Sequence, residues 1–84
     1  MNKPTQFILP LELAFIRWSV VGVQWNELSG DFPLIIPFLA GWGHRCMGLE
    51  MPKELGTFQN SFRVGWREAD SMIAIELQRQ ENSR

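Results

Sequence analysis

The hydrophobic and polar positions along the chain divide it into four segments, separated by residues that break helices. Residues 1–9 form an arm that changes from polar to apolar. From Pro10 to Leu28, apolar residues recur at steps of three and four, a spacing that predicts a helix. Pro10 suits the first position of a helix, and Gly30 suits the position just after its end. We therefore expect a helix over residues 10–28.

This first helix is apolar around most of its circumference. One apolar stripe consists of Leu11, Ala14, Phe15, Trp18, Val21, Gly22, Trp25 and Leu28, and a second consists of Leu13, Ile16, Val20 and Val23. A helix with two apolar faces is normally buried on both sides. A chain of 84 residues has little with which to cover the second side. A strand over residues 19–23 is the competing local prediction, because three of these residues are valines.

The third segment predicts a helix that starts at Pro33 or Pro37, since proline suits a helix start, and that ends near Met47. Residues 48–56 follow as a loop, with a glycine at each end and Pro52 in the middle.

The fourth segment has the clearest helical pattern. Its apolar residues keep steps of three and four and so form one face: Phe58, Phe62, Trp66, Ala69, Ile73 and Leu77. Residues 78–84 are polar, and we expect them to fray.

Two glycines fall inside the last two predicted helices, each directly before a tryptophan: Gly41 before Trp42, and Gly65 before Trp66. A glycine inside a helix weakens it by about 1 kcal/mol relative to alanine. Such a residue usually has a packing reason. We expect Gly41 and Gly65 to lie near the crossing of these two helices, where a missing side chain lets the axes approach closely.

These elements predict a small all-α domain of three or four helices. A length of 84 residues fits a single domain over residues 1–84. It would consist of the arm at 1–9, the apolar helix at 10–28 and a two-helix unit at 38–77. The apolar surface left over on the first helix predicts that two copies dimerise through it.

Composition narrows the function classes. The single cysteine, Cys46, excludes an internal disulfide and a multi-cysteine zinc site, and a free thiol fits the cytoplasm. The net charge of -1 argues against a protein that coats nucleic acid electrostatically. The apolar stretch at 7–25 lacks the marks of a secretory signal, and Glu12 and Arg17 interrupt it, so we expect no membrane span.

No constellation of residues predicts an enzyme. His44 is the only histidine, and Cys46 two positions later does not share its helix face, so we expect no metal site. Glu50 and Glu54 lie in a loop with no apolar pocket implied around them. We expect no catalytic residues and no cofactor.

Four basic residues are candidates for contacts with phosphate, RNA or an acidic patch on a partner: Arg45, Lys53, Arg63 and Arg67. Arg63 and Arg67 are one helical turn apart and share a face. Such a pair can bind two phosphates. An ordinary solvated helix face is the alternative interpretation.

One part of the chain resembles a known family. The residues that carry the resemblance are Phe38-x-x-Gly41-x-x-His44-x-x-x-Gly48, then Pro52, then Phe62-x-x-Gly65-Trp66-Arg67-Glu68-Ala69. This pattern, over about residues 38–72, is similar to the ribosome modulation factor family, whose closing run is Trp-x-x-Gly-Trp-Arg-Glu-Ala. Phe62 replaces the first tryptophan of that run, and the rest matches.

The resemblance implies a two-helix unit that binds ribosomal RNA and promotes ribosome dimerisation in resting bacteria. The four basic residues above would then be the RNA contacts. Three features depart from the family: the net charge is -1 where the family is strongly basic, Lys53 stands where the family has tyrosine, and the helix at 10–28 has no counterpart.

The excess apolar surface of the first helix leads to the principal functional hypothesis. Tryptophan and other large apolar side chains anchor protein interfaces. The expected partner-binding residues are Leu13, Ile16, Trp18, Val20, Val23 and Trp25. We expect a non-enzymatic regulator that inhibits a protein partner, such as an anti-activator that covers the dimerisation surface of a transcription regulator. A ribosome or rRNA binder of the hibernation type is the alternative.

Overall fold

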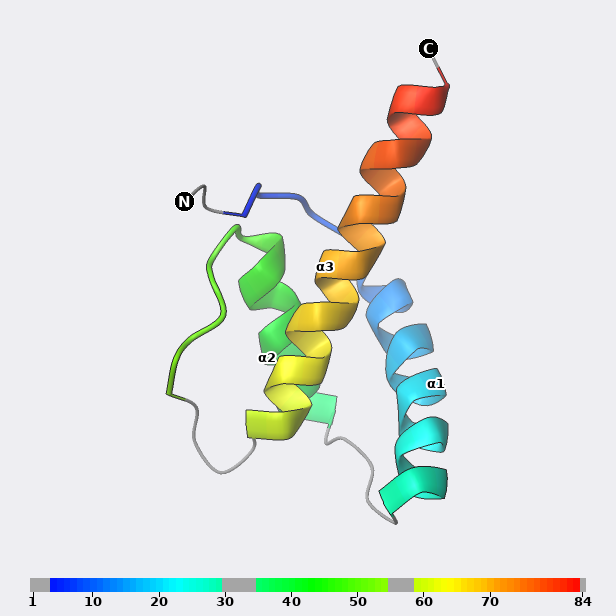
Figure 1. Ribbon diagram of the computed structural model, residues 1–84, viewed down its shortest axis with the longest axis vertical. Helices are drawn as coiled ribbons and strands as arrows, with labels where there is room; N and C mark the ends of the chain where they lie inside the picture. The colour runs from blue at the N-terminus through cyan, green and yellow to red at the C-terminus, as the bar shows by residue number, and fades with distance from the viewer. Residues whose placement is uncertain (1–3, 30–34, 55–58, 84) are drawn as a thin grey trace.

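The computed structural model describes residues 4–29, 35–54 and 59–83, without the side chains of 21–29 and 59. Three helices form there, α1 (Leu11–Ser29), α2 (Ile35–Cys46) and α3 (Gln59–Asn82), and the described residues contain no strand (Figure 1). The predicted all-α, three-helix class is confirmed, and the alternative of a strand over residues 19–23 is wrong. Gly30, Pro33 and Phe58, which figured in the predicted boundaries, lie outside the described residues.

The predicted helix ends agree with the structure to within one residue for α1 and at the end of α2. The prediction that residues 78–84 fray is wrong for most of that segment, because α3 continues to Asn82. Its last turns are supported by Arg79, whose guanidinium donates two hydrogen bonds to the Glu76 carboxylate one turn earlier. A pair at this spacing stabilises a helix locally.

α2 and α3 form the densest part of the molecule and run in the same direction, crossing with their backbones in contact (Figure 1). A Cβ atom on Gly41 would lie 2.0 Å from the carbonyl oxygen of Phe62, and one on Gly65 would lie 1.9 Å from that of Phe38. Any side chain at either glycine would overlap the opposite backbone. The prediction that Gly41 and Gly65 mark the crossing is confirmed.

Because α2 and α3 are parallel, the loop between them must return along the pair, and two ring nitrogens hold its first part. Trp66 Nε1 donates to the carbonyl oxygen of Leu49 at 3.0 Å, and His44 Nε2 lies 3.1 Å from that of Glu50. Leu49 is thereby linked to α3 and Glu50 to α2.

The arm at residues 4–10 folds over the end of α2. The amide of Phe7 donates to the carbonyl oxygen of Cys46 at 2.8 Å. Gly48 has a φ of 78°, which favours glycine, and a Cβ there would lie 2.8 Å from the carbonyl oxygen of Pro4. Because Gly48 has no side chain, the chain can turn there at the end of α2, and the arm can pass close to its backbone.

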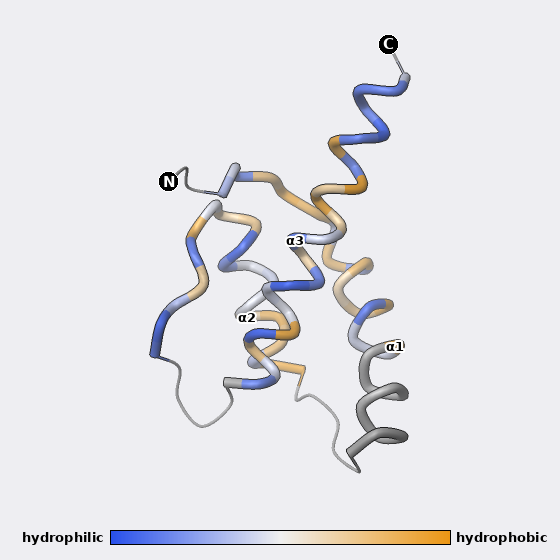
Figure 2. The backbone as a smooth tube through the Cα atoms, viewed as in Figure 1, coloured by the Kyte–Doolittle hydropathy of each residue, from blue (hydrophilic) through white to orange (hydrophobic). Residues whose placement is uncertain are grey.

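The core lies where the three helices meet. Ala14 of α1, Phe38 of α2 and Ala69 of α3 have no exposed surface, and Trp42 and Ile73 are almost fully buried. The rings of Phe38 and Trp42 stack with their centroids 6.1 Å apart. Polar residues are concentrated towards the end of α3, away from this core (Figure 2).

Two parts of the predicted core pattern differ from the structure. Leu77, placed on the core face of α3 by its spacing, is 40% exposed. It lies on the end of α3 that extends past the other two helices, where no neighbouring helix covers it (Figure 1). Leu11 and Phe15, assigned to the same stripe as Ala14, are exposed as well.

Candidate interaction surfaces

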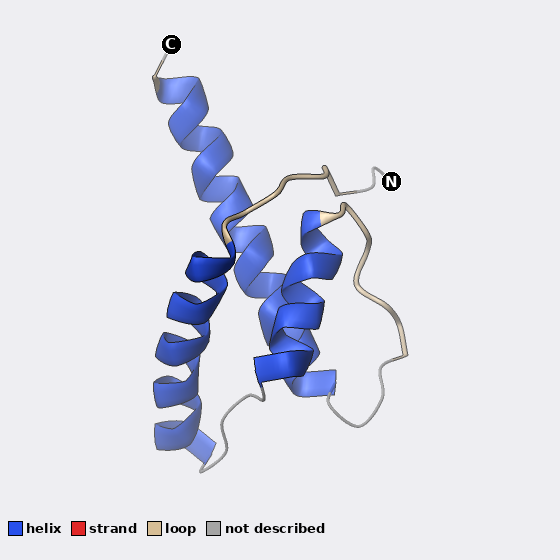
Figure 3. Cartoon of the chain, turned by 180° about the vertical axis from the view of Figure 1, so that it is seen from behind, coloured by secondary structure: helices blue, strands red, loops and turns tan. Residues whose placement is uncertain are grey.

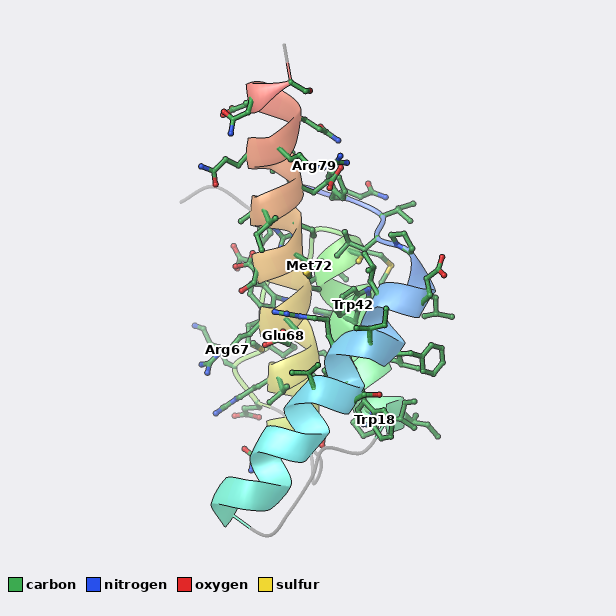
Figure 4. The ribbon with its side chains drawn as sticks, turned by 90° about the vertical axis from the view of Figure 1, so that its right-hand side faces the viewer. Trp18, Trp42, Arg67, Glu68, Met72 and Arg79 are labelled. Atoms are coloured by element: carbon green, nitrogen blue, oxygen red, sulfur yellow. The ribbon has the colours of Figure 1, made fainter. Side chains whose placement is uncertain are left out.

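α1 packs on the rest of the molecule through only one side. Ala14 is fully buried, while Leu13 and Trp18 are partly buried against the core. The Arg17 guanidinium forms a salt bridge with the Glu68 carboxylate of α3. Figure 4 looks onto α1 from outside, with α3 behind it and Trp18 and Glu68 labelled. Leu13, Ala14, Arg17 and Trp18, two adjacent pairs one helical turn apart, define the inner side of α1.

The opposite side, which we call the outer face of α1, consists of Leu11, Glu12, Phe15, Ile16, Ser19 and Val20, all exposed. Four of these six residues are large and apolar, with exposed fractions between 43% at Phe15 and 59% at Leu11. They form two pairs that are each one helical turn apart, Leu11 with Phe15 and Ile16 with Val20, on either side of Glu12 and Ser19. Exposed apolar surface of this kind is typical of an interaction site.

The structure divides the predicted partner-binding residues. Ile16 and Val20 lie on the outer face, with 57% and 47% of their surface exposed. Leu13 and Trp18 lie on the inner side and pack against the core. Val23 and Trp25 belong to the part of α1 whose side chains the structure does not describe.

The sequence interpretation missed Leu11 and Phe15 as members of the outer face. Two overlapping apolar stripes gave no indication of which would face the core, because both had helical spacing. The usable signal was the small residue Ala14, which is fully buried, together with Arg17, which pairs with Glu68 of α3.

Glu12 is the one charged residue of the outer face. Within the described part of the chain, no cation pairs with it, and Ser19 directs its hydroxyl to the Phe15 carbonyl oxygen at 3.0 Å. Any partner that covers this face must therefore accommodate a carboxylate.

The four predicted anion contacts have different environments. Lys53 and Arg67 are exposed, and Arg63 is half-buried. Figure 4 shows the side chain of Arg67 extending outward from α3. No carboxylate among the described residues forms a salt bridge with any of these three.

Arg45 is different because its side chain is enclosed by the fold. It is 5% exposed; its Nε donates to Asp70 Oδ1 at 2.7 Å, and its Nη1 donates to the Thr5 carbonyl oxygen at 2.7 Å. The guanidinium also lies 5.6 Å from the centre of the Trp66 ring. Arg45 therefore joins the arm, α2 and α3, and its guanidinium is engaged within the fold.

His44 and Cys46, the residues considered for a metal site, pack within the fold. Cys46 is a buried free thiol, and the His44 ring packs edge-on against Phe62 with 5.4 Å between the centroids. Nowhere in the described ranges do three His, Cys, Asp or Glu side chains gather in a way that could hold a metal ion. Among the same residues, no helix has the length and apolar character needed to cross a membrane.

Comparison of the chain with protein-family models, with curated proteins and with solved structures gives no match.

Proposed function

We propose that this chain is a small, non-enzymatic regulatory protein that binds a protein partner through the outer face of α1 and inhibits that partner by covering its surface. The observation that carries the proposal is the exposure of Leu11, Phe15, Ile16 and Val20 along one side of a helix. Its most concrete form is an anti-activator that occupies the dimerisation surface of a transcription regulator. Inhibition by occupancy requires no catalytic group.

The charge pattern of this face favours a protein over a lipid surface. Helices that lie on membranes combine their apolar face with many Lys and Arg residues. The six residues of the outer face include none, and the nearby Arg17 is engaged with Glu68.

Glu12 specifies the chemistry of the partner. Burying a carboxylate without a cation or hydrogen-bond donors is costly. A second copy docking its own outer face here would bring another Glu12 and, from the described positions, no cation. We therefore favour a different protein, whose apolar helix carries a lysine or arginine opposite Glu12, over the dimer through the first helix that the sequence predicted.

The proposal is tested by affinity capture from a bacterial lysate with and without nuclease, comparing Ile16→Glu with Ile75→Glu. These two isoleucines are matched controls, because they are 57% and 58% exposed on different helices. Ile16→Glu should lose the captured protein, and Ile75→Glu should retain it in both samples. Equal capture by both variants would contradict the proposal.

The alternative is a ribosome or rRNA binder that uses Lys53, Arg63 and Arg67. The observation in its favour is that these cations have no carboxylate partner among the described residues. Contacts with phosphate weaken steeply as salt increases. This function predicts capture of ribosomes that is lost at moderate salt and in the double variant Arg63→Ala with Arg67→Ala. Capture that persists in both cases would exclude it.

A further inference from the structure

α2 carries a second apolar surface that the fold does not use. It consists of Ile36, Ala40 and Gly43 of α2 and of Met47 in the turn directly after it, which follow one another at steps of four, three and four. Ile36 is 78% exposed and Met47 is 58% exposed, and Ala40 is exposed between them. We call these residues the outer face of α2. The opposite side of α2 carries the buried residues Phe38, Gly41 and Arg45. Seen from behind, α2 lies in front of α3 (Figure 3).

Gly43 has no packing role among the residues that the structure describes. A Cβ atom added to it would meet nothing within 4 Å, whereas one added to Gly41 on the same helix would overlap the backbone of Phe62. Glycine weakens a helix interior, so an isolated one usually has a packing or functional reason. The described residues supply no such reason for Gly43, and close approach of a backbone from another molecule would supply one.

The outer face of α2 is symmetric about its middle. Two large side chains, Ile36 and Met47, flank two small residues, Ala40 and Gly43. If a second α2 lies antiparallel across it, Ala40 faces Gly43 of the second copy and Ile36 faces Met47 of the second copy. The small residues then allow the helix axes to approach at the centre, while the large ones cover the ends. A pattern that complements itself in this way suits a twofold interface.

We propose that two copies of this chain associate through the outer faces of α2, with the two helices antiparallel. The face contains no charged or polar side chain, so pairing with itself buries no carboxylate and brings no like charges together. This distinguishes it from the outer face of α1, which contains Glu12. The residues of the outer face of α1 are not part of this interface.

The available area sets the strength of the association. The exposed fractions of Ile36 and Met47, with the two small residues between them, amount to on the order of 400 Å² of apolar surface per copy, against about 800 Å² per partner in a standard interface. An interface of about half the standard size is weak and transient. The dimer should therefore form reversibly as the concentration rises.

Sedimentation equilibrium from about 10 μM to about 1 mM, the range that brackets a weak dimer, tests the proposal. Wild type should change from monomer to dimer, and Ala40→Glu should weaken association at least tenfold by placing a carboxylate at the centre of the interface. Ala74→Glu is the matched control, because it makes the same change at an exposed alanine of α3 and should leave association unchanged. Circular dichroism verifies that both variants keep their helices.

Two further variants keep the inference separable from the proposed function. Met47→Glu should also weaken the dimer, whereas Ile16→Glu should leave it intact and lose only the captured partner. The inference is overturned if wild type remains monomeric throughout the range, or if Ala40→Glu and Met47→Glu associate as wild type does. It is equally overturned if Ile16→Glu alone abolishes the dimer, because the interface would then lie on α1.

Discussion

Arg45 and Asp70 form a salt bridge whose two ends differ in burial. The Arg45 side chain is 7% exposed, whereas the Asp70 side chain is 50% exposed, and 2.7 Å separates Nε from Oδ1. Asp70 pairs with a cation that also holds the arm, through the carbonyl oxygen of Thr5. Substitution of Arg45 and substitution of Asp70 should therefore lower the free energy of unfolding by different amounts.

Asp70→Ala should reduce the free energy of unfolding more than Arg45→Met does. The aspartate variant leaves a buried guanidinium without its counterion, and breaking a buried pair in this way costs about 3–5 kcal/mol at the upper limit. The methionine variant removes the buried charge and leaves a carboxylate that water already reaches. Urea denaturation of both variants and of the double variant measures the difference. Equal losses would show that the Arg45 charge is not effectively buried.

Alanine substitutions at three glycines should separate the helix crossing from open helix surface. Gly41→Ala and Gly65→Ala each place a Cβ in steric overlap with a carbonyl oxygen of the opposite helix, so the helices must move apart. Overpacking of this kind typically costs about 1–3 kcal/mol, occasionally more. Gly43→Ala meets open space and should stabilise the monomer by about 0.5–1 kcal/mol.

Thermal or urea unfolding at low concentration, where any dimer dissociates, provides the measurement for the three glycine variants. A loss of stability in Gly43→Ala comparable with that in Gly41→Ala would contradict the open environment of Gly43.

The pKa of Glu76 should be lower in the folded chain than in an unfolded peptide, because it accepts hydrogen bonds from Arg79 and lies beside that positive charge. A lowered folded pKa means that the pair supports α3 above the ordinary glutamate range and that this support is lost as the pH falls through the lowered value. Both groups are on the surface, so the effect on global stability is slight.

Titration of the Glu76 side chain by NMR measures this shift directly. In Arg79→Gln the pKa should return towards its ordinary value, and amide protection in the last turn of α3 should decrease. An unchanged Glu76 pKa in the variant would rule out the pair as its cause.

The parts of this fold that were predictable depended on local spacing. Periodicity located the three helices, and Gly41 and Gly65, each before a tryptophan, identified the crossing of α2 and α3. The sequence also contains the pentapeptide Phe-x-x-Gly-Trp twice, at 38–42 and 62–66, and this repeat matches the reciprocal contacts of the two glycines. Crossing contacts of this kind leave a local signature because each helix supplies the same elements.

The candidate surfaces were harder to predict because they depend on how the helices are oriented. α1 is apolar on several sides, so its spacing alone did not show that Leu11 and Phe15 would be exposed while Leu13 packs inside. Nor could it show that Arg45 would be enclosed by Thr5 and Asp70, which lie far from it in the sequence. Burial of a charge by distant segments is a property of tertiary packing.

α1 should open before the rest of the molecule unfolds. One side of it is solvated, and on the other it is held by Ala14, its partly buried neighbours and the Arg17–Glu68 salt bridge, whereas α2 and α3 are in backbone contact. Segments with few buried apolar contacts open with a smaller free energy than the global value. Native-state hydrogen exchange should therefore show that amides of residues 14–20 exchange through a local opening, and that those near Gly41 and Gly65 exchange only on global unfolding.

Arg17→Gln tests which contact controls that opening. Arg17 and Glu68 are 34% and 24% exposed, so their salt bridge should contribute at most about 1 kcal/mol. The variant should lower the opening free energy of α1 by up to that amount while the protection of α2 and α3 stays the same. If all three helices instead lose protection together, α1 is part of the cooperative core, and its outer face is presented by a rigid helix. If α1 alone loses protection, a partner that binds this face must also bear the free energy of holding the helix in place.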